Sequence, residues 1–174
     1  MKLGQSIFQL LFFVFLSCGN DTNVASIESP ENKTQEQSIT PRAIENFNYA
    51  DYVLSPEAEE IVRNWEKYQE LAIQIGYLKK ADLSFFKGDR KLIDEFLLEL
   101  KEEVPSNLET NPIESRIVIL ETKMLKLYDN LTLDNIDLNL QLKSIKEVLV
   151  AFANLNLQIN KKIEFDFYNQ IQPE

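Results

Sequence analysis

The stretch NPIESRIVILETKMLKLYDNL, from Asn111 to Leu131, decides the fold. Its large apolar side chains recur at spacings of 4, 3, 4, 3 and 4 residues, at Ile113, Ile117, Leu120, Met124, Leu127 and Leu131. That spacing is typical of an α-helix with one buried face. Asn111 is predicted to cap this helix, with Pro112 at the first helical position and Glu114 completing a capping box.

Three further segments carry the same periodicity. Ser55-Pro56 predicts the start of a helix that runs to about Lys80, with an apolar face at Ile61, Trp65, Tyr68, Ala72 and Ile75. Another helix is expected to follow Gly88-Asp89 and to stop at Pro105. The longest is expected to follow a turn near 129–134 and to reach Phe167.

These patterns predict an all-α fold: an antiparallel bundle of about four helices over residues 55–170. Two alternatives stay open. The last two seams could pair in a coiled-coil dimer, which would make the protein an oligomer. Residues 155–160 alternate with period two, as a strand would, although the helical context on both sides favours a helix.

The composition argues against catalysis. The chain has no His and one Cys, which removes the usual general base, imidazole metal ligands and any intramolecular disulfide. Asp134 and Asp137 are interpreted as helix caps rather than metal ligands. Ser84 and Lys87 match a Ser-x-x-Lys spacing, but no companion motif accompanies them. We therefore predict no enzyme activity, no metal and no cofactor.

The net charge of −10 bears on partners. Binding to nucleic acid requires clustered Lys and Arg, so a nucleic-acid partner is not expected. The acidity is interpreted mainly as a source of solubility, and it could attract a basic partner.

The N-terminal residues have the pattern of an export signal. Lys2 precedes an apolar run from Ile7 to Leu16, which as a helix would span about 15 Å, half of a bilayer core. That length predicts the apolar region of a signal peptide rather than a transmembrane helix. Ser17 and the only cysteine, Cys18, follow at once.

Residues 15–18, Phe-Leu-Ser-Cys, resemble the lipobox of bacterial lipoproteins, in which signal peptidase II cuts before a Cys that carries diacylglycerol. Phe15 stands where Leu is usual and Leu16 where a small residue is usual. This looser form is similar to lipoprotein signals of Bacteroidota, and the chain resembles small helical lipoproteins of Flavobacteriia in its general pattern. The alternative is an ordinary secretory signal with an incidental Cys.

The resemblance implies that residues 1–17 are a signal peptide and that Cys18 carries acyl chains such as palmitate. Those chains would then hold the protein in the membrane of the cell envelope, since two or more give stable anchoring. Gly19 occupies the place where Asp often retains lipoproteins in the inner membrane of diderm bacteria. The outer membrane, with the domain facing the periplasm or the cell surface, is therefore favoured.

Two segments join the expected anchor to the bundle. Residues 18–40 are polar and predict a flexible tether after the lipidated Cys. Residues 41–54 carry Ile44, Phe47, Tyr49, Tyr52 and Val53, which predict a segment that docks on the domain. A peptide-like recognition segment is the alternative.

The sequence thus predicts a lipid-anchored envelope protein with a non-catalytic helical interaction domain and an envelope protein as partner. Arg116, Glu121 and Trp65 are the candidate partner surface. The competing interpretations are intrahelical ion pairing for Arg116 and Glu121, and a place in the core for Trp65. Two other functions stay open: a bundle that binds or senses a small apolar or lipid ligand, and an acidic immunity-type inhibitor of a basic toxin.

Overall fold

The structure, a computed structural model, describes residues 38–171. Every regular element in this part of the chain is a helix, so the predicted all-α class is confirmed. The predicted signal peptide (1–17), Cys18 and most of the tether (18–40) lie outside the described residues. The elements within them are α1 (Pro41–Glu45), α2 (Pro56–Val62), α3 (Glu66–Lys79), the 3-10 helix η1 (Phe85–Lys87), α4 (Arg90–Glu102), α5 (Asn111–Thr132) and α6 (Leu138–Ile171).

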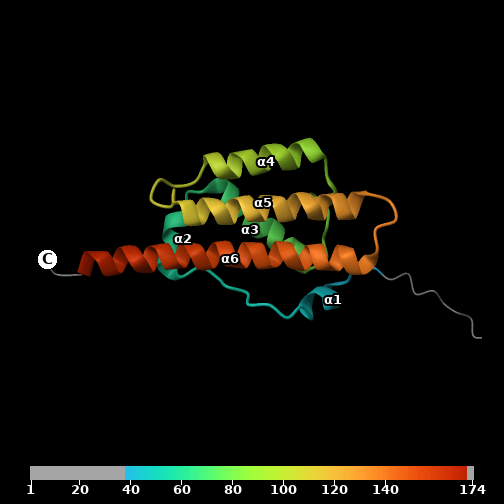
Figure 1. Ribbon diagram of the computed structural model, residues 1–174, viewed down its shortest axis with the longest axis horizontal. Helices are drawn as coiled ribbons and strands as arrows, with labels where there is room; N and C mark the ends of the chain where they lie inside the picture. Colours follow the sequence, from blue (N-terminus) through green and yellow to red (C-terminus); the bar gives the residue numbers. More distant parts are fainter. Residues whose placement is uncertain (1–37, 172–174) are drawn as a thin grey trace, which may run out of the picture. The chain divides into compact units, whose positions relative to one another are not determined.

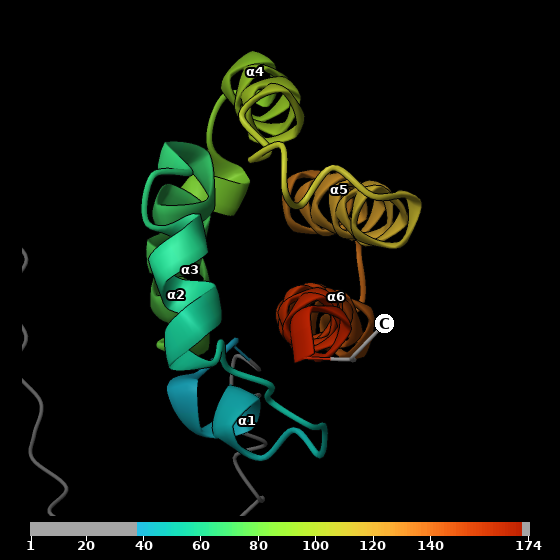
Figure 2. The same ribbon diagram turned by 90° about the vertical axis from the view of Figure 1, so that its left-hand side faces the viewer.

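The described helices surround one core. Seen nearly along α6, α2 and α3 lie on one side, α5 and α6 on the other, with α4 and α1 at opposite ends of the gap (Figure 2). Every helix contributes buried apolar side chains to this core. Across residues 38–171, no helix combines the length and the apolar character that crossing a membrane requires.

α5 and α6 form a long antiparallel hairpin (Figure 1). The predicted seam of α5 is buried from Ile113 to Leu127, and Leu131 is half-buried. α6 is helical throughout, including residues 155–160, so the helical interpretation of that stretch is confirmed. α6 continues to Ile171, one turn beyond the predicted end at Phe167.

The prediction of a single helix over residues 55–80 is wrong, because the helix is interrupted between α2 and α3. Trp65 has φ −88° and ψ 84°, outside the helical region, and it precedes the first residue of α3. Its indole N–H donates to the carbonyl of Leu100 at 3.1 Å, while the side-chain amide of Gln69 donates to the carbonyl of Val62 at 2.8 Å. The first bond satisfies a carbonyl in the last turn of α4 that a helix terminus leaves without a partner, and the second adds to the backbone N–H of Trp65, which donates to the same carbonyl of Val62 at 3.0 Å. The bundle therefore has more and shorter helices than predicted.

Two other helix starts lie close to the predicted positions. α5 begins at Asn111 with Thr110 as its N-cap, one residue earlier than expected. Asp137 caps α6, since its carboxylate accepts from the backbone N–H of Asn139 at 2.8 Å. The capping interpretation of Asp137 is therefore confirmed.

The segment predicted to dock contains α1, and it packs only in part. Ile44 is buried in the core, and Phe47 and Tyr49 pack against it. Tyr52 and Val53 are exposed, so only part of the segment's large side chains pack on the domain.

Hydrogen bonds between side chains of α6 and the backbone of this segment hold its exposed part. The side-chain amide of Asn156 donates to the carbonyl of Tyr52 at 3.0 Å, and that of Asn160 donates to the carbonyl of Val53 at 2.8 Å. The side-chain oxygen of Asn160 accepts from the backbone N–H of Ser55 at 2.9 Å. Two asparagines one turn apart on α6 thus fix residues 52–55 along that helix.

Candidate functional site

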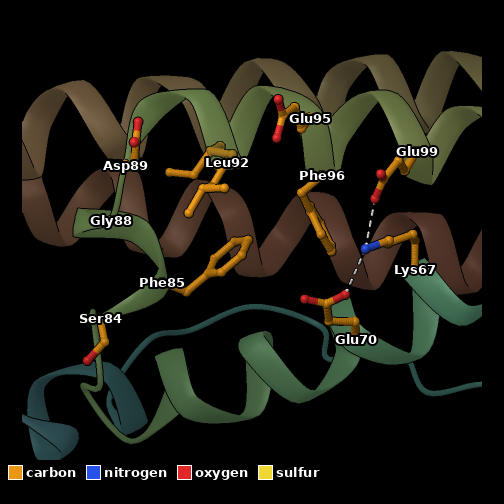
Figure 3. A pocket seen from close by; sticks show the side chains of 11 residues that line it. Lys67, Glu70, Ser84, Phe85, Gly88, Asp89, Leu92, Glu95, Phe96 and Glu99 are labelled. Atoms are coloured by element: carbon orange, nitrogen blue, oxygen red, sulfur yellow. Dashed lines mark hydrogen bonds and ion pairs between the residues drawn. The ribbon is translucent and has the colours of Figure 1, made fainter.

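A groove of about 460 Å³ between α3 and α4 has Lys67 at one end (Figure 3). Its ammonium lies 2.8 Å from a carboxylate oxygen of Glu99 and 3.2 Å from one of Glu70, and 5.6 Å from the centre of the Phe96 ring. Hydrogen bonds to Glu99, and then to Glu70, raise the pKa of Lys67. A charged lysine shared by two carboxylates ties α3 to α4 and is not a reactive amine.

The Ser-x-x-Lys spacing of Ser84 and Lys87 has no counterpart in a reactive site. The hydroxyl of Ser84 donates to the carboxylate of Asp82 at 2.6 Å, in a turn beside the groove. That bond satisfies the hydroxyl without Lys87. Within residues 38–171, no three side chains of His, Cys, Asp or Glu gather in a way that could hold a metal ion.

Trp65 is a core residue, so its assignment to a partner surface is wrong. Its side chain is 0% exposed, and its ring packs 5.2 Å from that of Tyr68, centre to centre. The alternative interpretation, a place in the core, is the one that the structure bears out.

Arg116 and Glu121 lie on different sides of α5. Glu121 pairs with Lys101 of α4 at 2.9 Å, so its ion pair joins two helices rather than lying within one. Five residues along a helix correspond to a rotation of about 140° at 100° per residue, which places Arg116 on the α6 side. The two residues therefore do not form a single surface.

The side of α5 that carries Arg116 borders a second groove, about 470 Å³ in volume, between α5 and α6. We call it the basic groove. Ile119 on α5 and Val150 and Ala151 on α6 supply its apolar side chains. Arg116 precedes Ile119 by three residues and so belongs to the same stripe of α5. The remaining lining residues are Lys123, Lys143, Lys146, Glu147 and Asn154.

One carboxylate organises the lysines on the α5 side of the groove. An oxygen of Glu147 lies 2.9 Å from the ammonium of Lys126 and 3.1 Å from that of Lys123. Hydrogen bonds from these lysines, that from Lys126 first, lower the pKa of Glu147. Glu147 therefore remains ionised at neutral pH and balances only one of the two positive charges.

The lysines on the α6 side have no such partner. Among residues 38–171, no carboxylate lies within ion-pair distance of Lys143 or Lys146. The groove thus gathers four lysines, Lys123, Lys126, Lys143 and Lys146, and one carboxylate, in a chain with an excess of acids. Positive potential is concentrated at this groove, against the sign of the net charge.

A third groove, about 740 Å³ in volume, lies between α2 and the C-terminal part of α6. Ile61, Ile163 and Phe167 are its apolar side chains, and Phe167 is 60% exposed. Asp166 and Glu164 border it, but each pairs with a lysine of the same helix. Glu57 also lines it and has no ion pair among the described residues, so this groove is weakly acidic rather than basic.

Sequence patterns singled out Arg116, which is not among the lining residues, and missed the basic groove itself. Two signals could have identified it: the 3, 4, 3 spacing of Arg116, Ile119, Lys123 and Lys126, and the pair Lys143 and Lys146 one turn apart. Each of these spacings alone is also typical of a helix face that is exposed to solvent. Only the pairing of α5 with α6 places the two stripes side by side.

Comparisons with known proteins assign no family. No family model matches the chain, and no solved structure gives a significant match. The chain is similar to the RecBCD enzyme subunit RecB of Borreliella burgdorferi, with 26% identity over 153 residues. This match covers 80% of the chain but only 13% of that much longer protein. The similarity is too low and too partial to transfer an activity.

Proposed function

We propose that this protein is a lipid-anchored component of the cell envelope, whose helical domain binds a protein partner without catalysing a reaction. The basic groove carries the interaction part of this proposal. It combines apolar side chains with lysines from both helices, and that combination lets an interface bury apolar area and select a partner by charge. The absence of His from the sequence supports a non-catalytic role.

The anchor rests on the N-terminal sequence. An apolar run, Ser17 and the single Cys18 have the order of a lipoprotein signal. An acylated Cys18 would confine the domain to the neighbourhood of the membrane and raise its effective concentration toward envelope partners.

Intact-mass analysis and cell fractionation test the anchor. We expect native protein in the membrane fraction, without residues 1–17 and with the added mass of acyl chains. Cys18→Ala should shift the protein out of that fraction. Residues 1–17 still attached to an unmodified thiol would refute the anchor, as would a Cys18→Ala protein that is equally membrane-bound.

Photo-crosslinking in living cells tests the interaction. A photoreactive residue in place of Asn154, which lines the basic groove, should capture one dominant envelope protein. The same residue in place of Ile73, exposed on α3, serves as the control. Identical capture patterns at the two sites, or no capture at either, would contradict a partner at this groove.

The groove between α2 and α6 favours a second candidate, the binding of a small apolar ligand. Its volume of about 740 Å³ is within the range of small-molecule sites, and its apolar side chains include the exposed Phe167. Native mass spectrometry of protein purified from its own host should then detect a bound lipid that Ile163→Asp removes. Ligand-free protein would argue against this role.

A further inference from the structure

We propose that the basic groove binds an acidic amphipathic α-helix of the partner protein, laid between α5 and α6. This inference rests on the proposed interaction function and names the chemistry of the partner. It follows from the charges of the groove, its apolar side chains and its length.

The charges require an acidic occupant. Lys143 and Lys146 have no carboxylate partner among the described residues, and Lys123 and Lys126 share the single carboxylate of Glu147. Carboxylates of a partner would complete ion pairs on both sides of the groove, because one pair of lysines comes from α5 and the other from α6. A basic partner would be repelled here even though the whole chain is acidic.

To match the apolar residues of the groove, the partner must carry apolar side chains between those carboxylates. Ile119 is 41% exposed, and Val150 next to it on α6 is half-buried. An amphipathic helix supplies this arrangement, with apolar residues three or four apart along the centre of one face and acids on either side. Burying the exposed part of Ile119 adds affinity that ion pairs at the rim alone would not give.

The length suits a short helix. From Lys143 to Asn154 the α6 side spans about 16 Å at 1.5 Å per residue. That distance accommodates about three turns of a partner helix, which can place two or three apolar side chains against those of the groove.

An anionic membrane surface would also match the charges, but it matches the shape less well. Residues that enter a bilayer interface are protruding apolar or aromatic side chains. Here the groove has no aromatic lining residue, and Ile119, at 41% exposed, is the most exposed of its apolar side chains, since Val150 is half-buried and Ala151 is buried. The geometry points to an inserted helix rather than to a lipid surface.

The test is a titration of the purified full chain with two labelled synthetic peptides of about 18 residues. The ordered peptide carries leucines three and four residues apart, flanked by glutamates, on an alanine background. The scrambled peptide has the same composition without a common face. Fluorescence anisotropy should give a Kd at least about tenfold lower for the ordered peptide, and this Kd should rise with salt.

Variants with matched controls locate the binding site. Lys143→Glu/Lys146→Glu should raise the Kd by about tenfold or more. Lys80→Glu/Lys87→Glu makes the same change of net charge on exposed residues away from the groove, and it should leave the Kd nearly unchanged. Ile119→Ser should weaken binding, whereas Ile73→Ser on α3 should not.

Three outcomes would overturn the proposal: no binding of either peptide, equal binding of both, or equal weakening by the two charge-reversed variants. Binding to phosphatidylglycerol vesicles without binding to the ordered peptide would assign the groove to a lipid surface instead. None of these results depends on Cys18. A failed titration alongside an acylated protein that still captures a partner would therefore remove the groove assignment and leave the proposed function standing.

Discussion

The hydroxyl of Tyr68 on α3 donates to the side-chain oxygen of Asn156 on α6 at 2.7 Å, inside the core. Both residues are buried. Burial first, and then the charge of Glu59, raise the pKa of Tyr68, so the phenol keeps the proton that it donates. The amide group of Asn156 bonds the carbonyl of Tyr52 on its other side. One asparagine thus joins α3, α6 and the segment before α2.

Tyr68→Phe should lower the free energy of unfolding by about 1–3 kcal/mol, because the buried oxygen of Asn156 loses its donor. Urea unfolding followed by circular dichroism measures this change. Tyr77→Phe removes the same hydroxyl from a side chain that is 47% exposed, and it should cost less than about 0.5 kcal/mol. Equal losses in the two variants would show that the bond to Asn156 contributes nothing.

Trp65→Phe should lower the free energy of unfolding by about 2–4 kcal/mol. The substitution removes buried volume and also the donor to the carbonyl of Leu100, which lies in the last turn of α4. Thermal unfolding provides the measurement. Phe86→Leu is the comparison, because it truncates a fully buried side chain that takes no part in this hydrogen bond. It should lower the free energy of unfolding by less. A smaller effect of Trp65→Phe would contradict the role assigned to the indole N–H.

Ala81→Gly should stabilise the protein by about 1 kcal/mol. Ala81 has φ 62°, a left-handed conformation that glycine adopts without steric cost, and it follows the C-cap of α3. The backbone N–H groups of Ala81 and Asp82 donate to the carbonyls of Leu78 and Tyr77, as in a Schellman motif.

The control for this prediction is Ala72→Gly, which makes the same substitution inside α3. It should destabilise by about 1 kcal/mol, because glycine weakens a helix interior. Chemical denaturation of both variants should give changes of opposite sign. Destabilisation by both would disprove the strain assigned to Ala81.

The stability that Glu147 provides should depend on pH. Because its lysine partners lower its pKa in the folded protein, its ionised form stabilises the fold. This contribution is complete above the ordinary value of 4.5 and is lost as the pH falls through the lower folded value. Glu147→Gln should therefore be less stable than the wild type at neutral pH, with a difference that shrinks in acid.

Urea unfolding at neutral pH and well below pH 4.5 tests this prediction. Glu95→Gln on α4 is the control, because it removes one negative charge together with only an exposed ion pair to Lys91, which contributes little. A stability difference between wild type and Glu147→Gln that stayed constant with pH would contradict the assigned ion pairs.

The sequence was most informative where one helix face is buried along its whole length. From Ile113 to Leu127, each apolar residue of the predicted seam is buried, because helical spacing alone determines which side chains share a face. The cap of α6 at Asp137 was predictable for a similar reason, since it depends only on residues near it in the chain.

Features that depend on distant residues were missed. The break at Trp65 is stabilised by the carbonyl of Leu100, thirty-five residues away, and the apolar spacing across the break is the same as in a continuous helix. The basic groove likewise requires residues near Lys123 to lie beside those near Lys143. Spacing within one helix does not specify which helix will lie next to it, nor on which side.

The asparagine bonds at residues 52–55 also determine how the domain would respond to mechanical load. A pull on the chain ahead of α1 is transmitted through residues 46–55 before it reaches α2. Asn156 and Asn160 tie that segment sideways to the middle of α6. Tension would therefore be shared with the longest helix of the bundle, and α2 would be shielded from being unwound turn by turn.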